Sequence, residues 1–180
     1  MKYRDQTIVI DRSVPAIQAW KDLPDGIRAE VIDNKLYVLS PATPYHARST
    51  GRLFYALTNY VIEYDLGEVF THSVGVFVKG KDTVVEPDIS FFSKENLLVL
   101  ERDGIHTIPD LVIEVLSTNR KHDLVTKKEL YEKTGVQEYW LVDPDTKNTT
   151  GYTLKDGMYG EPLLMNSEIY VHIFNKTFKF

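Results

Sequence analysis

The stretch Pro109-Asp110-Leu111-Val112-Ile113-Glu114-Val115-Leu116-Ser117 holds a run, 111–116, that is apolar except at Glu114. A strand that is apolar on both faces is typical of a sheet covered by other elements on both sides. The stretch therefore predicts a central strand of an α/β sheet. Alternate residues of a strand point to the same side, so Glu114 shares its side with Val112 and Leu116.

A carboxylate in such a strand points to chemistry, because an ionised carboxylate among apolar side chains is costly unless it is paired or bound to a cation. Asp88 lies in a second apolar stretch, 84–92, and Glu30 lies in Ala29-Glu30-Val31-Ile32. Three converging carboxylates suit Mg²⁺ or Mn²⁺, which take oxygen ligands and keep waters open to a phosphate substrate. The alternative is that each carboxylate ends a strand or pairs with a buried Lys or Arg. This alternative suffices to explain any one of the three carboxylates, but it explains all three together less well.

The remaining elements follow from periodicity and turn residues. Two β-prone runs around Asp33-Asn34 predict a hairpin, and apolar residues at three- and four-residue spacing predict a long amphipathic helix at 45–64. The other predicted helices are Ala16–Lys21, begun by Ser13-Val14-Pro15, and 123–133, ended by Thr134-Gly135. The predicted strands are 28–32, 35–39, 68–78, 84–92, 110–116 and Glu138–Val142, followed by hairpin strands in the tail at 149–154 and 168–180. This order predicts an α/β fold: a mixed β-sheet flanked by helices, with extra β-hairpins at the termini.

Lys127 lies on the predicted helix that follows the Glu114 strand. Asp123, Lys127 and Tyr131 are spaced by four, so they share one helix face. A lysine beside a metal can hold the attacking water or stabilise charge developing on phosphorus. The alternative is a solvated lysine paired with Asp123, and the residue pattern alone favours that alternative.

Composition limits the classes of function. The chain has 180 residues, 43% of them hydrophobic, which predicts one domain over residues 1–180. It has no cysteine, which excludes disulfides and thiolate chemistry, and no signal-peptide core, so we expect a soluble cytoplasmic protein. The net charge of -5 argues against extended phosphate binding, though not against an enzyme that meets nucleic acid through a metal and a few basic residues. Glycine-rich phosphate loops and zinc helix motifs are absent, so kinases and zinc hydrolases have no support.

Six segments, taken in order, resemble the Uma family of restriction endonucleases. That family belongs to the superfamily named for its Pro-Asp … Asp/Glu-x-Lys motif, and the resemblance covers roughly residues 15 to 155. The segments are Ala29-Glu30-Val31-Ile32-Asp33-Asn34-Lys35-Leu36, Ser40-Pro41-Ala42-Thr43-Pro44-Tyr45-His46, Val85-Glu86-Pro87-Asp88-Ile89, Pro109–Ser117 as quoted above, Lys127-Lys128-Glu129-Leu130-Tyr131 and Gly135-Val136-Gln137-Glu138-Tyr139-Trp140-Leu141-Val142-Asp143-Pro144.

The resemblance implies catalytic roles for Glu30, Asp88, Glu114 and Lys127, with Asp88 and Glu114 as ligands of Mg²⁺ or Mn²⁺. The family pattern places a lysine two residues after the second acid, but here that residue is Leu116. Lys127 matches the lysine that family members carry on the next helix instead. His46 matches a family position at the start of the long helix. It is a candidate for a phosphate or water contact, and a surface residue beside the helix cap is the alternative.

The function that follows is a metal-dependent nuclease that hydrolyses phosphodiester bonds of DNA. The alternative is a catalytically silent nuclease-fold module that binds nucleic acid or a protein partner; the acidic net charge and Leu116 favour it, whereas Asp88, Glu114 and Lys127 together favour catalysis. Activity on RNA would use the same site. We also expect a homodimer, because an enzyme that cuts both strands of a duplex commonly acts in pairs.

Overall fold

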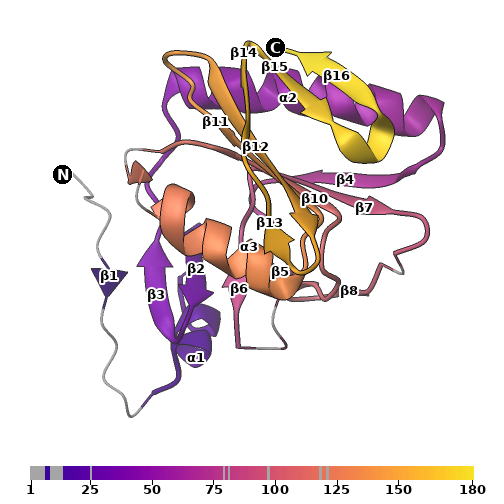
Figure 1. Cartoon of the computed structure of the whole chain (residues 1–180). Coiled ribbons are helices and arrows are strands. Elements are labelled where there is room, and N and C mark those ends of the chain that lie inside the picture. Colours follow the sequence, from indigo (N-terminus) through magenta and orange to yellow (C-terminus); the bar gives the residue numbers. More distant parts are fainter. Residues whose placement is uncertain are drawn as a thin grey trace.

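The structure is a computed structural model, and it describes residues 7–8, 14–24, 26–78, 80, 82–96, 98–117, 119–120 and 122–180. Ser13, part of the predicted start of the first helix, lies outside these residues. Their strands form two sheets and one separate hairpin (Figure 1). The predicted mixed sheet with flanking helices and terminal hairpins is confirmed, and a second sheet is added to it.

The first sheet contains the strand quoted above, β10, at its centre. Its order is β13-β12-β11-β10-β7-β4, and β14 pairs with β12. β10 is parallel to β11 and antiparallel to β7, so the sheet is mixed as predicted. The bounds are β4 Gly67–Thr71, β7 Ile89–Ser93, β10 Leu111–Val115, β11 Glu138–Val142, β12 Asn148–Lys155, β13 Met158–Tyr159 and β14 Leu163–Asn166.

The second sheet contains the predicted hairpin and has the order β1-β3-β2-β6-β5-β9-β8. Asp33 and Asn34, between β2 and β3, both have positive φ, at 49° and 54°, as a tight hairpin turn requires. The bounds are β1 Thr7–Ile8, β2 Ala29–Ile32, β3 Lys35–Val38, β5 Val76–Phe77, β6 Val84–Val85, β8 Leu100–Glu101 and β9 Gly104–Ile105. Helix α1, Ala16–Lys21, packs on β2 and β3.

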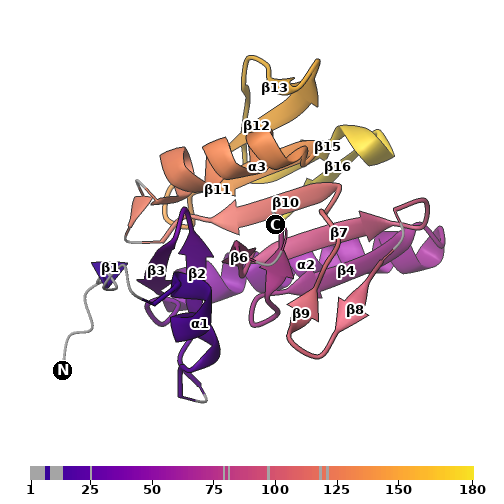
Figure 2. The same ribbon diagram turned by 90° about the horizontal axis from the view of Figure 1, so that it is seen from below.

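Helices cover both faces of the first sheet, and Figure 2 shows β10 running between α3 and α2. On one face, α2 (Pro44–Glu63) and the hairpin of β15 (Glu168–Val171) and β16 (Lys176–Lys179) pack against Ile113 and Val115. On the other face, α3 (Lys128–Thr134) packs with Val112 and Leu116. Glu114 shares that second face, as the alternation of the strand predicted. A 3₁₀ turn, His172–Phe174, joins the two strands of the hairpin.

Two of the predicted strands are wrong as continuous elements. Residues 84–92 divide into β6 and β7, which belong to different sheets, and residues 68–78 divide into β4 and β5 in the same way. The physical reason at the first break is Pro87, which has no backbone N–H to give to a ladder. Asp88 therefore lies at the crossing from one sheet to the other, immediately before β7, and not within a strand.

The predicted helix at 123–133 also differs in part. His122–Lys127 form a π-helical segment, and α3 continues from it. The helix ends at Gly135, whose φ of 92° is the left-handed cap predicted from the sequence. Among the described residues, no helix combines the length and the apolar character that a membrane span needs.

Candidate active site

A cleft of about 300 Å³ is lined by residues of both sheets. Residues 39–43, which precede α2, lie along it, and so do residues 115–117, which end β10 and follow it. Polar side chains from four separate parts of the chain share its lining. They are His46 of α2, Asp88 before β7, Glu114 of β10, and His122, Asp123 and Lys127 of the π-helical segment.

Lys127 is the centre of a buried ion-pair network. Its Nζ lies 2.8 Å from Oε1 of Glu30 and 2.9 Å from Oε1 of Glu114, whereas Asp123 is farther away, at 3.9 Å. Only 4% of the lysine is exposed, so its interpretation as a solvated partner of Asp123 is wrong. Burial opposes the charge of Lys127, but the carboxylates around it raise the pKa well above its ordinary value, so the side chain is an ammonium.

Glu30 lies behind the cleft, completely buried in β2. Besides Lys127, it meets Nε2 of His122 at 2.9 Å and accepts a hydrogen bond from the backbone N–H of Glu86, also at 2.9 Å. Burial alone would raise the pKa of Glu30, but Lys127 and His122 outweigh it and lower the pKa to about 2. Glu30 is therefore ionised, and it holds Lys127 in place from the rear.

Glu114 shares Lys127 with Glu30, but its surroundings raise its pKa, whereas those of Glu30 lower it. Its Oε1 accepts hydrogen bonds from Lys127, at 2.9 Å, and from the hydroxyl of Tyr131, at 2.8 Å. Burial, assisted by the negative charges of Asp88 and Asp123, raises the pKa of Glu114 to about 8 in spite of Lys127. Burial also raises the pKa of Asp123. One lysine thus faces more buried carboxyl groups than it can neutralise.

Asp88 lies next to Glu114 because of the strand register. Ile89 pairs with Ile113 across antiparallel β7 and β10, so the register continued by one residue sets position 88 opposite position 114. The Oδ2 atom of Asp88 accepts a hydrogen bond of 2.9 Å from the backbone N–H of Val115. The structure therefore brings Asp88, Glu114, Lys127 and, behind them, Glu30 into one site.

His46 belongs to this site and is not a free surface residue. It lies in the first turn of α2, where its N–H donates to the capping hydroxyl of Thr43. Its Nε2 lies 3.0 Å from Oδ2 of Asp88. Burial alone would lower the pKa of His46, but the hydrogen bond and the charge of Asp88 raise it above its ordinary value.

Three site residues carried no role in the sequence interpretation. His122 joins Glu30 and packs on the ring of Tyr37, at 4.4 Å between centroids. Asp123 accepts hydrogen bonds from the backbone N–H and the hydroxyl of Ser117, both at 3.3 Å. Tyr131 donates to Glu114. The four-residue spacing of Asp123, Lys127 and Tyr131 was a signal for two of them, whereas nothing in the pattern marked His122.

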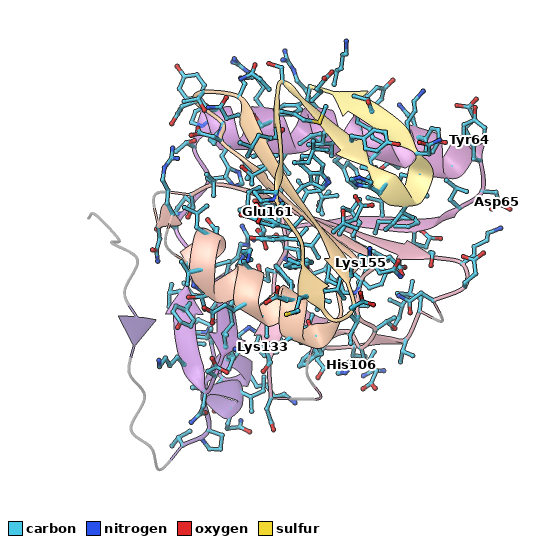
Figure 3. All side chains as sticks on the ribbon, in the orientation of Figure 1. Tyr64, Asp65, His106, Lys133, Lys155 and Glu161 are labelled. Atoms are coloured by element: carbon cyan, nitrogen blue, oxygen red, sulfur yellow. The ribbon has the colours of Figure 1, made fainter. Side chains whose placement is uncertain are left out.

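A second acidic group lies away from the cleft, on the hairpin of β8 and β9. Glu101, Asp103 and His106 bring possible metal-ligand atoms within 4.8 Å of one another. Among the described residues, this is the group whose three ligand atoms lie close enough to hold one metal ion. Figure 3 labels His106 near the lower edge of the molecule. Asp103 is already paired with His106, at 2.9 Å, and with Lys21, at 3.7 Å, and none of the three residues lines the cleft.

Comparisons with known proteins bear on the fold and the family of the chain. A solved structure described as "a putative nuclease belonging to DUF820 from Anabaena variabilis" matches with a TM-score of 0.70 and 23% sequence identity, over 88% of this chain and 90% of that chain. Such identity establishes likeness of fold alone. The curated proteins gave no match. The model of the family Uma2, described as "Putative restriction endonuclease", matches residues 14–171, most of the chain, and the protein therefore belongs to the Uma2 family.

Proposed function

We propose that the protein is a metal-dependent nuclease that hydrolyses phosphodiester bonds of DNA, with Glu30, Asp88, Glu114 and Lys127 as its catalytic group. Membership of Uma2 and the nuclease-like fold support nuclease function. The observation that carries the finer proposal is the excess of buried carboxyl groups over cations at Lys127, described above. Such an excess is expected where a site is built for a divalent cation.

Asp88 and Glu114 fit Mg²⁺ or Mn²⁺ as ligands. Both line the cleft, and both keep one carboxyl oxygen, Oδ1 of Asp88 and Oε2 of Glu114, without a hydrogen bond to any other described residue. Magnesium commonly uses one or two protein carboxylates and completes its shell with water and substrate oxygens. When bound here, the ion would lower the pKa of a water molecule and polarise the scissile phosphate.

Lys127 supplies fixed positive charge beside that position. Glu30 and Glu114 hold its ammonium from two sides, so little reorganisation is needed as charge develops on the phosphate oxygens. His46 lies on the cleft wall against Asp88 and would orient that carboxylate, or a water beside it. These groups bind, orient and stabilise charge, which is what phosphodiester hydrolysis asks of a protein.

Cleavage of plasmid, single-stranded DNA and RNA in Mg²⁺ or Mn²⁺ tests the proposal. We expect products with one of these metals and none in EDTA, and a large loss in Asp88→Ala and Lys127→Ala proteins that are shown to be folded. Cleavage that persists in both variants would refute the assigned site. A folded protein that cuts none of these substrates but still binds them would favour the alternative of a silent nuclease-fold module.

For cleavage of both strands of a duplex we propose a homodimer, because a duplex has two strands to cut. Gel filtration with light scattering is the direct measurement, and we expect about twice the chain mass of 20.7 kDa. A monomer at micromolar concentration, with or without DNA, would remove this part of the proposal and leave the active site unaffected.

A further inference from the structure

We infer that the cleft takes an unpaired strand of DNA, with Tyr45 stacked on one of its bases and with Arg28 and Arg120 bound to its phosphates. The inference rests on the proposed nuclease function and adds the form of the substrate to it. All three side chains line the cleft that contains the candidate active site.

Tyr45 is placed to stack with a base. It follows the cap of α2, lines the cleft and is 59% exposed, which is high for a large aromatic side chain. The guanidinium of Arg48 lies over one face of its ring, 5.9 Å from the centroid, and the inferred base stacks on the other face. Stacking on an aromatic side chain requires a base whose face is uncovered, and unpaired nucleotides have such faces whereas stacked duplex pairs do not.

The two arginines are oriented and still have donors to give. Arg28 uses Nε for Glu86, at 2.7 Å, and Arg120 uses one terminal nitrogen for Asp143, at 2.9 Å. Their side chains are 31% and 49% exposed. A guanidinium has five N–H donors, so each arginine, fixed by its carboxylate partner, can still bind phosphate oxygens.

The charge of the protein argues against a duplex as the preferred ligand. Binding along a duplex depends on many phosphate contacts, but the net charge is -5 and the cleft lining has more aspartates and glutamates than lysines and arginines. The cleft of about 300 Å³ has the size of a small-ligand pocket. Its wall at residues 38–42 is largely apolar. Such a site gains affinity from base stacking and a few phosphates, as proteins that bind single strands do.

Fluorescence anisotropy with labelled DNA in Ca²⁺ tests the inference separately from cleavage. The probes are a twelve-nucleotide thymidine strand and a blunt duplex of the same length. We expect the single strand to bind at least about tenfold more tightly than the duplex, and Tyr45→Ala to weaken single-strand binding by about tenfold. The matched control is Tyr55→Ala, on the same helix, 70% exposed and outside the cleft lining, which should change binding less than about twofold.

Arg120→Gln gives an independent measurement. Loss of one phosphate contact should reduce the slope of log K against log salt by about 0.7 for a single strand. Equal or tighter duplex binding would overturn the inference, as would equal losses in Tyr45→Ala and Tyr55→Ala. Duplex cleavage unchanged by Tyr45→Ala would overturn it while the nuclease function stands. Tyr45-dependent binding of the single strand without cleavage of any substrate would uphold it and refute the function.

Discussion

Lys127→Met is expected to lower the free energy of unfolding by about 3–5 kcal/mol and to abolish cleavage. The substitution keeps the length and apolar stem of the side chain but removes the ammonium that Glu30 and Glu114 share. Glu30 then keeps His122 and Glu114 keeps Tyr131, but both buried carboxyl groups lose the ammonium, which is the costly way to break a buried ion pair. Urea unfolding followed by circular dichroism at pH 7 measures the loss of stability.

The control for Lys127→Met is Lys133→Met, on the same helical stretch. Lys133 pairs with Glu129 at 3.7 Å but is 73% exposed, so its loss should change stability by less than about 0.5 kcal/mol. Figure 3 labels Lys133 on α3. A Lys127→Met protein as stable as the Lys133→Met protein would contradict the buried network.

A triple variant separates stability from chemistry. Lys127→Met combined with Glu30→Gln and Glu114→Gln removes the ammonium and both of its carboxyl partners together. Replacing a whole buried ion cluster by neutral groups costs far less than breaking it. We expect most of the lost stability to return and cleavage to stay absent. Cleavage restored along with stability would show that Lys127 supports the fold and not the reaction.

Much of the fold, and the carboxylates of the candidate site, could be predicted from the sequence for physical reasons. β10 and β11 were predicted within one residue, because a continuous apolar run has a direct physical meaning. The prediction that Glu114 is a functional residue had the same basis, because its charge stands at a strand position that requires burial. The convergence of Glu114 with Asp88 was a hypothesis at that point, because the register of β7 on β10 that sets it is a long-range property.

Lys127 shows what the local pattern could not give. A spacing of four predicted a helix face but could not show which side of the helix was buried, and the π-helical segment changes that spacing. Leu124 and Val125 are 42% and 44% exposed, whereas charged Asp123 and Lys127 are buried, the reverse of an ordinary amphipathic helix. The inversion is explained by the two carboxyl groups that pair with Lys127, Glu114 of β10 and Glu30 of the other sheet.

The Pro-Asp pairs are a second case in which local sequence does not identify the site residue. The chain contains four Pro-Asp pairs. Two of them, Pro87-Asp88 and Pro109-Asp110, immediately precede a strand of the first sheet. The two aspartates are almost equally buried, at 7% and 6% exposure. Local sequence and burial therefore do not distinguish the two aspartates, but their hydrogen-bond partners do. The two residues are a matched pair for mutagenesis.

Asp88→Asn is expected to reduce cleavage at least about 100-fold, with a change in stability below about 1 kcal/mol. The asparagine oxygen still accepts the hydrogen bond from Val115, so the backbone keeps its arrangement while the negative charge at the cleft is lost. Initial cleavage rates at saturating Mg²⁺ and urea unfolding of the same preparations give the two quantities.

Asp110→Asn should lower the stability of the protein and leave cleavage unchanged. Both oxygens of Asp110 are occupied by protein donors: Oδ2 by the N–H of Ser93, at 2.7 Å, and the amide of Asn96, at 3.2 Å, and Oδ1 by the amide of Gln137, at 2.9 Å. An asparagine amide would meet at least one of these donors with a donor of its own, which costs about 1–3 kcal/mol in a buried position. Asp110 does not line the cleft, so cleavage per folded molecule should be unchanged. Full activity in Asp88→Asn with lost activity in folded Asp110→Asn would move the active site to Pro109-Asp110.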